Sequence, residues 1–172
     1  MFDLLIRGDR VVTPHGVGPW EIAVKDGVVA SLAARGTVGA AQAARVIDAG
    51  GCIVIPGGID PHVHCAWYMP AFRPGEPSGL SGPPEQVSRA ALWGGTTTLI
   101  DFAACKPDRE GDESSSQSIR DAIEARDQDF AGRCFCDYAY HVMLRGRVPP
   151  ATIGELAEAV QAGYATVKLF TT

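Results

Sequence analysis

Hydrophobic and polar residues alternate in four stretches of the chain after residue 55, and this alternation predicts β-strands. The predicted strands lie near residues 59–64, 96–102, 134–142 and 164–170. Stretches with helical spacing of apolar residues separate them. Strands that alternate with helices are typical of βα units around a parallel sheet.

Three amphipathic stretches predict the helices of these units. Thr152-Ile153-Gly154-Glu155 fits a capping box, and apolar residues follow it at helical spacing. The apolar face would consist of Ile153, Leu156, Ala157 and Val160. A second helix is predicted over 115–130, with Ile119, Ala122 and Ile123 inward and Arg126 in solvent among acidic residues. A third is predicted over 84–93, ended by two glycines.

Before residue 55, turn residues separate short runs of apolar residues. Short strand-like runs at 4–6, 22–24, 28–32 and 52–55 predict a small β-rich module. We therefore predict two domains, 1–55 and 56–172. The Pro- and Gly-rich segment 73–79 predicts a long loop, of the kind that often covers an active site.

The first candidate site is the segment Asp60-Pro61-His62-Val63-His64. Strand alternation would put Asp60, His62 and His64 on one face. Imidazole is the commonest metal ligand among side chains, and a pair at i, i+2 can converge on one cation. The alternative is a strand with one solvent-exposed polar face. The spacing alone does not distinguish this from a metal site.

Lys168 is an unusual residue for the apolar strand predicted at 164–170. Alternation places Ala165, Val167 and Leu169 on the opposite face. Because lysine is rarely buried without a partner, the position indicates either an edge strand with the ammonium in water or a lysine whose chemistry has been altered.

Other polar residues lie on the two middle strands. Asp101 ends one of them, and Asp137 and His141 share a face of the other. In a (β/α) barrel the chemistry lies at the carboxyl ends of the strands. We therefore expect one mouth to gather six residues, Asp60, His62, His64, Asp101, His141 and Lys168. For Asp101, Asp137 and His141 taken singly, a supporting role is favoured over direct chemistry.

Composition and net charge limit the classes of partner that this chain is expected to bind. The 172 residues are 46% hydrophobic and 20% charged, with a net charge of -5, which disfavours nucleic acid and anionic membranes. No run is long enough for a transmembrane helix or a secretory signal, so we expect a cytoplasmic protein. The charge is compatible with a small-molecule substrate. The five cysteines fit reduced thiols that pack, although Cys65 adjoins His64 and could line a site.

Four motifs in order resemble the amidohydrolase superfamily, closest to its hydantoinase and dihydropyrimidinase branch. They are IPGGIDPHVH at 55–64, GGTTTLIDF at 94–102, DYAYH at 137–141 and VKLF at 167–170. The resemblance spans the whole chain. It implies an α/β fold: the first half of a (β/α)8 TIM-type barrel, preceded by part of a small β-sandwich.

The resemblance also implies roles for three residues. His62 and His64 would bind the more buried metal of a binuclear centre, with zinc as the expected metal. Lys168 would react with carbon dioxide to give a carbamate that bridges the two metals, since a carbamate is an anion with two oxygens. A bridging hydroxide would then attack the carbonyl of a cyclic ureide.

Departures from the family pattern bear on the substrate. Dihydroorotases usually carry arginine two residues after the second histidine, where this chain has Ala66, so a carboxylate-bearing substrate is disfavoured. A hydantoin, a dihydropyrimidine or a related ureide fits the resemblance, and another cyclic amidase such as an allantoinase is an alternative. Trp67 and Tyr68 could pack on a planar ring or anchor the loop.

The length of the barrel portion is the largest departure. A complete barrel needs roughly 250 residues, so we expect an N-terminal portion of a longer enzyme that is inactive alone and forms a dimer or tetramer when complete. Two further histidines and an aspartate base would come from later strands. The second hypothesis is a non-catalytic assembly protein of the same branch; the retained His62, His64 and Lys168 favour the hydrolase.

Overall fold

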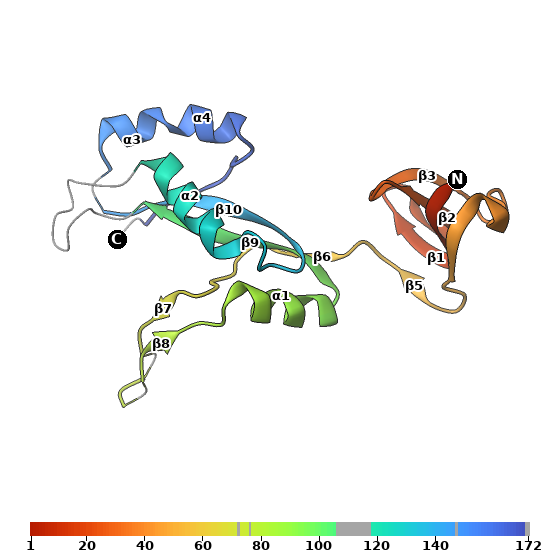
Figure 1. Cartoon of the computed structure of the whole chain (residues 1–172), viewed down its shortest axis with the longest axis horizontal. Helices are drawn as coiled ribbons and strands as arrows, with labels where there is room; N and C mark the ends of the chain where they lie inside the picture. The colour runs from red at the N-terminus through yellow and green to blue at the C-terminus, as the bar shows by residue number, and fades with distance from the viewer. Residues whose placement is uncertain (72, 76, 106–117, 147, 171–172) are drawn as a thin grey trace. The chain divides into compact units, whose positions relative to one another are not determined.

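The structure is a computed structural model that describes residues 1–71, 73–75, 77–105, 118–146 and 148–170. It divides into two compact units, Met1–Pro56 and Gly57–Thr172 (Figure 1). The boundary expected from the sequence, between 55 and 56, adjoins this division. Each unit is described by itself.

The first unit is a five-stranded sheet in the order β3-β2-β1-β4, with β5 also paired to β1. Its elements are β1 (Phe2–Thr13), β2 (Gly16–Lys25), β3 (Val28–Ala34), the 3-10 helix η1 (Ala40–Gln42), β4 (Ala43–Asp48) and β5 (Ile53–Val54). The hairpin between β2 and β3 turns at Asp26 and Gly27, which both have positive φ, as a two-residue hairpin loop requires. The sequence patterning missed β4 because most of that strand is exposed and lacks alternation.

A buried carboxylate organises the core of this unit beside Leu5 and Ala23. Glu21 is fully buried. Its Oε1 accepts from Arg7 Nε at 2.7 Å and its Oε2 accepts from the backbone N–H of Val38 at 2.8 Å. The carboxylate therefore joins β2 to β1 and to the segment before η1.

These contacts make the stability of the first unit sensitive to acid. Burial favours the neutral acid, but hydrogen bonds from Val38, Gly36 and Arg7 outweigh burial and lower the pKa of Glu21 from 4.5. A lowered folded-state pKa gives stability that is present above the unfolded-state pKa and is lost as pH falls through the folded value. We expect the free energy of unfolding to decline below about pH 4.5, and to decline less steeply in Glu21→Gln. The NMR indole signal of Trp20, followed in urea at several pH values, would measure this; equal slopes in both proteins would contradict it.

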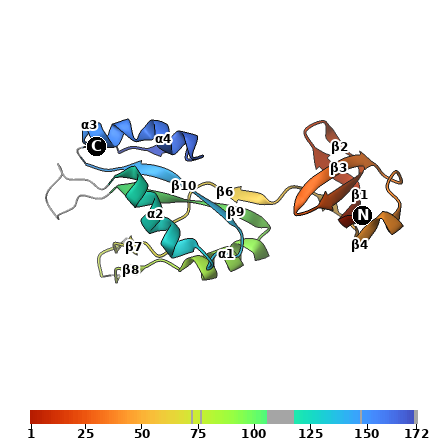
Figure 2. The same cartoon turned by 45° about the horizontal axis from the view of Figure 1, so that its top comes forward.

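The second unit is built on a four-stranded parallel sheet in the order β11-β10-β9-β6. The strands are β6 (Gly58–Asp60), β9 (Thr96–Cys105), β10 (Asp137–Leu144) and β11 (Val167–Lys168). The helices are α1 (Pro84–Trp93), α2 (Ile119–Phe130), α3 (Pro150–Gly154) and α4 (Leu156–Gln161), and a short ribbon pairs β7 (Tyr68–Met69) with β8 (Gly79–Leu80). Figure 2 shows α2 lying along β9 and β10. The four strands alternate with helices as predicted.

The two faces of this sheet have different surroundings. Leu99, Ala103 and Val142 pack with Ile119 and Phe130 of α2 in the main core, on what we call the helix face. Alternate residues of the same strands lie on the opposite face, which we call the inner face. There a small cluster contains Phe102, Ala104 and Met143, with Trp67 packed against it.

Strand β6 is shorter than predicted. It ends at Asp60, whereas alternation predicted a strand over 59–64. Pro61 has no N–H to donate, and the Asp60 carboxylate accepts the N–H of His62 at 3.1 Å. The chain still follows β9, because Val63 donates its N–H to Ile100 at 3.1 Å. At the other edge, the predicted strand 164–170 is reduced to Val167–Lys168.

The predicted capping box is wrong. The helix begins earlier, at Pro150, a position that proline favours because it has no N–H to satisfy. Thr152 is buried inside α3, and Ile153 and Val160 of the predicted apolar face are 52% and 49% exposed. The Glu155 carboxylate accepts instead from the N–H of Ile119, at the start of α2.

The other predicted helices agree more closely. Helix α1 has the predicted bounds. Helix α2 begins at Ile119, with Ser118 accepting the N–H of Asp121 at its N-terminus; residues 115–117 of the predicted helix lie outside the described residues. The predicted loop 73–79 connects β7 to β8, and Glu76 within it lies outside the described residues.

Candidate metal centre

The two candidate histidines lie directly after β6, next to each other. Their ring centroids are 5.1 Å apart, in an edge-to-face arrangement. Phe102 lies beside both, at 4.7 Å from His62 and 5.0 Å from His64. Phe102 is buried on the inner face, where its ring packs against both imidazoles. Apart from its place on an apolar strand, Phe102 had no feature in the sequence that indicated this contact.

The His64 ring fits a metal ligand. Its Nδ1 is buried and has no hydrogen-bond partner among the described residues. Burial lowers the pKa of His64, the charge of Asp101 opposes this, and His62, Arg126 and Lys168 add to the lowering. The ring is therefore held in the neutral form that binds metal ions. A cation at Nδ1 would satisfy an atom that otherwise carries the cost of an unpaired buried polar group.

Lys168 lies on the same face of the sheet. Strand β11 pairs with β10 in parallel register, with Lys168 opposite Met143, so both side chains lie on the inner face with Phe102. Lys168 is half-buried, and its Nζ is 5.3 Å from the centroid of the Phe170 ring. Within the described ranges no carboxylate forms an ion pair with it. This position fits both a lysine on an edge strand and a lysine whose chemistry has been altered.

His141 joins three neighbouring segments of the inner face. Its Nε2 lies 2.8 Å from the carbonyl oxygen of Pro61, and its Nδ1 lies 2.5 Å from Thr166 Oγ1. A carbonyl oxygen can only accept, so Nε2 donates to Pro61, and the Thr166 hydroxyl can pair with Nδ1 as donor or as acceptor. Both ring nitrogens are thus engaged, and His141 ties the segment before His62 to the segment before Lys168.

Asp101 was expected at the mouth of the barrel, but its side chain does not lie there. Alternation with Phe102 turns its side chain toward the helix face, where it is fully buried. Its Oδ2 accepts from the N–H of Cys65 at 2.7 Å, and its Oδ1 accepts from Trp67 Nε1 at 2.8 Å. Asp101 therefore fixes the segment that directly follows His64.

Arg126 is the partner that sequence reasoning missed, since it was predicted in solvent. The side chain is nearly buried, with Nη2 donating to Asp101 Oδ2 at 2.9 Å and to the carbonyl oxygen of Cys65. Nη1 donates to Asp129 at 2.8 Å. The guanidinium carbon also lies 5.6 Å from the centroid of the Trp67 ring. In the sequence Arg126 lies among acidic residues, and nothing else indicated that its side chain would face the sheet from α2.

The remaining candidates are distributed around this network. Trp67 anchors the loop through its indole N–H, whereas Tyr68 is 67% exposed and its hydroxyl donates to Ser78. Cys65 is buried, and burial raises the pKa of its thiol to about 12, so it is no thiolate at neutral pH. Asp60 is exposed and supports the turn to His62. Asp137 begins β10 opposite Thr98, away from His141's contacts.

The described residues supply only part of a metal-binding set. They contain no group of three or more His, Cys, Asp or Glu side chains able to hold a cation. The inner face offers the imidazoles of His62 and His64 together with Lys168, whereas both ring nitrogens of the nearby His141 already have partners. Among the helices that the structure describes, none has the length and apolar character needed to span a membrane.

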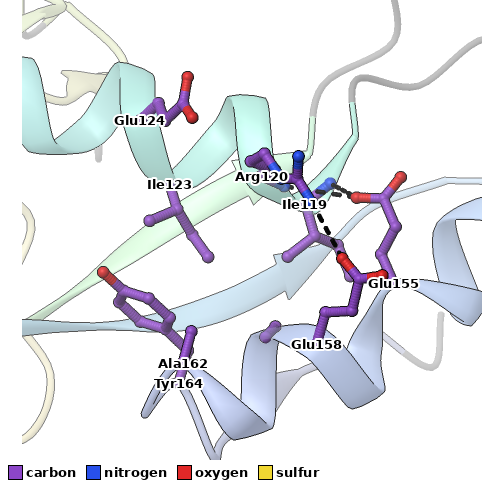
Figure 3. A pocket seen from close by; sticks show the side chains of 9 residues that line it. Ile119, Arg120, Ile123, Glu124, Glu155, Glu158, Ala162 and Tyr164 are labelled. Carbon is purple, nitrogen blue, oxygen red and sulfur yellow. Dashed lines mark hydrogen bonds and ion pairs between the residues drawn. The ribbon is translucent and has the colours of Figure 1, made fainter.

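A cavity lies elsewhere, between α2 and α4. It has a volume of about 340 Å³ and is lined by Ile119, Ile123 and Tyr164, with Arg120 and Glu158 paired at 3.0 Å on its rim (Figure 3). None of the candidate ligands lines it. It is a gap between helices on the helix face rather than part of the metal centre.

Comparison with known proteins points to one group of enzymes. No family model matches the chain. It is 36% identical over 168 residues to a D-hydantoinase of Streptomyces coelicolor, covering 96% of this chain and 33% of that protein. It is 34% identical over 144 residues to a dihydropyrimidinase of Rattus norvegicus, covering 82% and 25%. The chain thus spans about a third or less of the length of these relatives.

Solved structures agree with these relatives. A D-hydantoinase superposes with a TM-score of 0.74 at 28% identity, covering 96% of this chain and 32% of that one. A dihydropyrimidinase from Brevibacillus agri superposes with a TM-score of 0.73 at 27% identity, covering 98% and 32%. The parallel sheet and the β-module are therefore both shared with these structures.

Proposed function

We propose that this chain, which is similar to about a third or less of the length of D-hydantoinases and dihydropyrimidinases, serves metal-dependent hydrolysis of a cyclic amide as the N-terminal part of an amidohydrolase. It would supply the first half of a (β/α)8 barrel and part of a β-sandwich. The substrate class is a hydantoin, a dihydropyrimidine or a related ureide. The observation that carries the proposal is the His62–His64 pair, with the buried Nδ1 of His64 unpaired.

Two divalent metal ions, with zinc as the expected metal, would supply a Lewis acid and a water of lowered pKa. His62 and His64 would hold one of them through imidazole nitrogens. Lys168, in its neutral amine form, would add its Nζ to carbon dioxide, forming an N–C bond and releasing one proton to water. The product is an anionic carbamate on the face that the two imidazoles share, where it is a better ligand than an ammonium ion.

The surrounding residues hold this arrangement in place. Asp101 and Arg126 fix the backbone after His64 from the helix face, and His141 fixes the segment before His62. Trp67, whose ring centroid is 5.1 Å from that of His64, limits where that imidazole can turn. Supports of this kind typically change metal affinity or activity by about 10–100-fold when removed.

The first test replaces both histidines. In a protein that contains this chain within a complete barrel, the His62→Ala, His64→Ala double variant is expected to lose at least one metal ion per chain and essentially all hydrolysis of hydantoin and dihydrouracil. Elemental analysis and a ring-opening assay would measure the two effects. His15→Ala is the matched control, because His15 is exposed in the first unit.

The outcomes separate the two functional classes. Metal content that is the same in the double variant and the parent would remove the proposal. A parent protein that binds no metal and opens neither ring, while forming oligomers, would favour the non-catalytic assembly protein instead.

A further inference from the structure

A second cluster of metal-ligating side chains lies outside the candidate metal centre, in the turn between α2 and β10. Cys134 and Cys136 place their sulfur atoms 3.9 Å apart. Both side chains are half-buried against the edge of the main core. Phe135 between them is 56% exposed. The turn therefore presents two thiols side by side on one face.

The spacing of the two sulfurs matches the bite of a tetrahedral metal ion. Two thiolates bound to zinc at about 2.3 Å with tetrahedral geometry lie roughly 3.8 Å apart. A disulfide, in contrast, needs sulfurs at about 2.05 Å. The thiols are thus placed for chelation of a cation without movement, whereas a disulfide would require the sulfurs to approach.

The backbone around the pair is held on both sides. The N–H of Cys134 donates to the carbonyl oxygen of Phe130 at 3.1 Å, at the end of α2. The N–H of Phe135 donates to the buried hydroxyl of Ser88 in α1 at 3.0 Å. The guanidinium of Arg89 lies over the Phe135 ring at 5.0 Å. Two helices therefore pre-set the thiol spacing, which reduces the ordering cost of binding.

We propose that Cys134 and Cys136 form a chelating site for a thiophilic dication such as Cd2+ or Zn2+. Both S–H bonds lose their protons to water, and two sulfur–metal bonds form. In the described part of the chain no third His, Cys, Asp or Glu completes the site, so water fills the remaining positions. Soft thiolate ligands select such ions over Mg2+ and Ca2+.

This site is separate from the candidate metal centre. Cys136 directly precedes Asp137, the first residue of β10, whereas His141 and the residue opposite Lys168 lie further along the same strand. The pair therefore lies toward the amino ends of the parallel strands. Its occupancy does not depend on the proposed hydrolase function, and the two can be tested apart.

Titration of the reduced chain with CdCl2 tests the proposal. Thiolate-to-cadmium charge-transfer absorbance is expected to reach a plateau at one equivalent of Cd2+ per chain. Cys134→Ser and Cys136→Ser should each lose most of this absorbance, because one thiolate no longer chelates. Cys52→Ser, which removes the exposed thiol of the first unit, and the His62→Ala, His64→Ala variant should both retain it.

A protection experiment covers the case in which the serine variants do not fold. In the unchanged chain, one equivalent of Cd2+ should slow alkylation of Cys134 and Cys136 together by at least tenfold and leave Cys52 reactive, as read by peptide mass spectrometry. Absorbance that persists in a folded Cys134→Ser variant, or protection of Cys52 in place of the pair, would overturn the proposal.

Discussion

Asp101→Ala is expected to lower the free energy of unfolding of the second unit by about 3–5 kcal/mol. The carboxylate is fully buried and accepts from Cys65, Trp67, Phe102 and Arg126. Its removal leaves several buried donors without an acceptor, and the partly exposed Asp129 becomes the one carboxylate that is ion-paired with the buried Arg126 guanidinium among the described residues. Losses of this kind cost far more than the net value of one hydrogen bond.

Urea unfolding followed by tryptophan fluorescence would measure this change. A Trp20→Phe background removes the only tryptophan of the first unit, so that Trp67 and Trp93 report on the second unit alone. In the same background we expect the indole of Trp67 to become mobile in Asp101→Ala, since its N–H loses its acceptor.

Two further variants control for the loss of a side chain as such. Asp101→Asn keeps the shape but must present an amide N–H to donors, so an intermediate loss is expected. Asp137→Ala removes an exposed carboxylate at the start of the neighbouring strand and should change stability by no more than about 0.5 kcal/mol. If Asp101→Ala behaves like Asp137→Ala, the buried network does not hold the segment after His64.

Local patterning predicted the elements whose signals lie within a few residues. Helix α1 has the bounds predicted for it because its end depends on adjacent residues: Gly95 has a φ of 85°, which glycine adopts without strain. The pairing of His62 with His64 also depends on a spacing of two residues. Such features require no knowledge of the distant chain.

Features that depend on tertiary packing were not predictable in this way. From Leu99 onward both faces of β9 are apolar apart from Asp101, as expected for a parallel strand buried on two sides, so the sequence does not reveal which face is covered by helices. For this reason the predicted direction of the Asp101 side chain was wrong. Arg126 lies among acidic residues on α2 and reads as a solvated charge until its position opposite Asp101 is known.

The capping box failed through competition between partners. Glu155 was expected to accept a hydrogen bond within its own helix. Its carboxylate instead accepts the N–H of Ile119 at 2.7 Å, a group at the start of α2 that has no partner within that helix. That donor is 36 residues away in sequence. A local motif therefore correctly identified a capping residue and assigned it to the wrong helix.

Lys168→Ala is expected to abolish essentially all ring-opening activity in a complete barrel, with partial recovery on adding short carboxylates such as acetate or propionate. The proposal assigns to this lysine an anionic carbamate, because an unmodified ammonium would repel two dications. Alanine removes that anion and leaves space on the inner face opposite Met143, which a small carboxylate can occupy. Steady-state hydrolysis of dihydrouracil, with and without carboxylate, measures both effects.

Lys168→Arg is the matched control for charge and bulk. Arginine keeps a cation on β11, leaves no room for an added carboxylate and does not form a carbamate, since its guanidinium stays protonated. We therefore expect Lys168→Arg to be as inactive as Lys168→Ala and to gain nothing from carboxylates. The half-buried edge position of Lys168 makes a solvated ammonium the competing explanation. Full activity in Lys168→Arg would establish that explanation, because only a role as an ordinary surface cation survives the exchange.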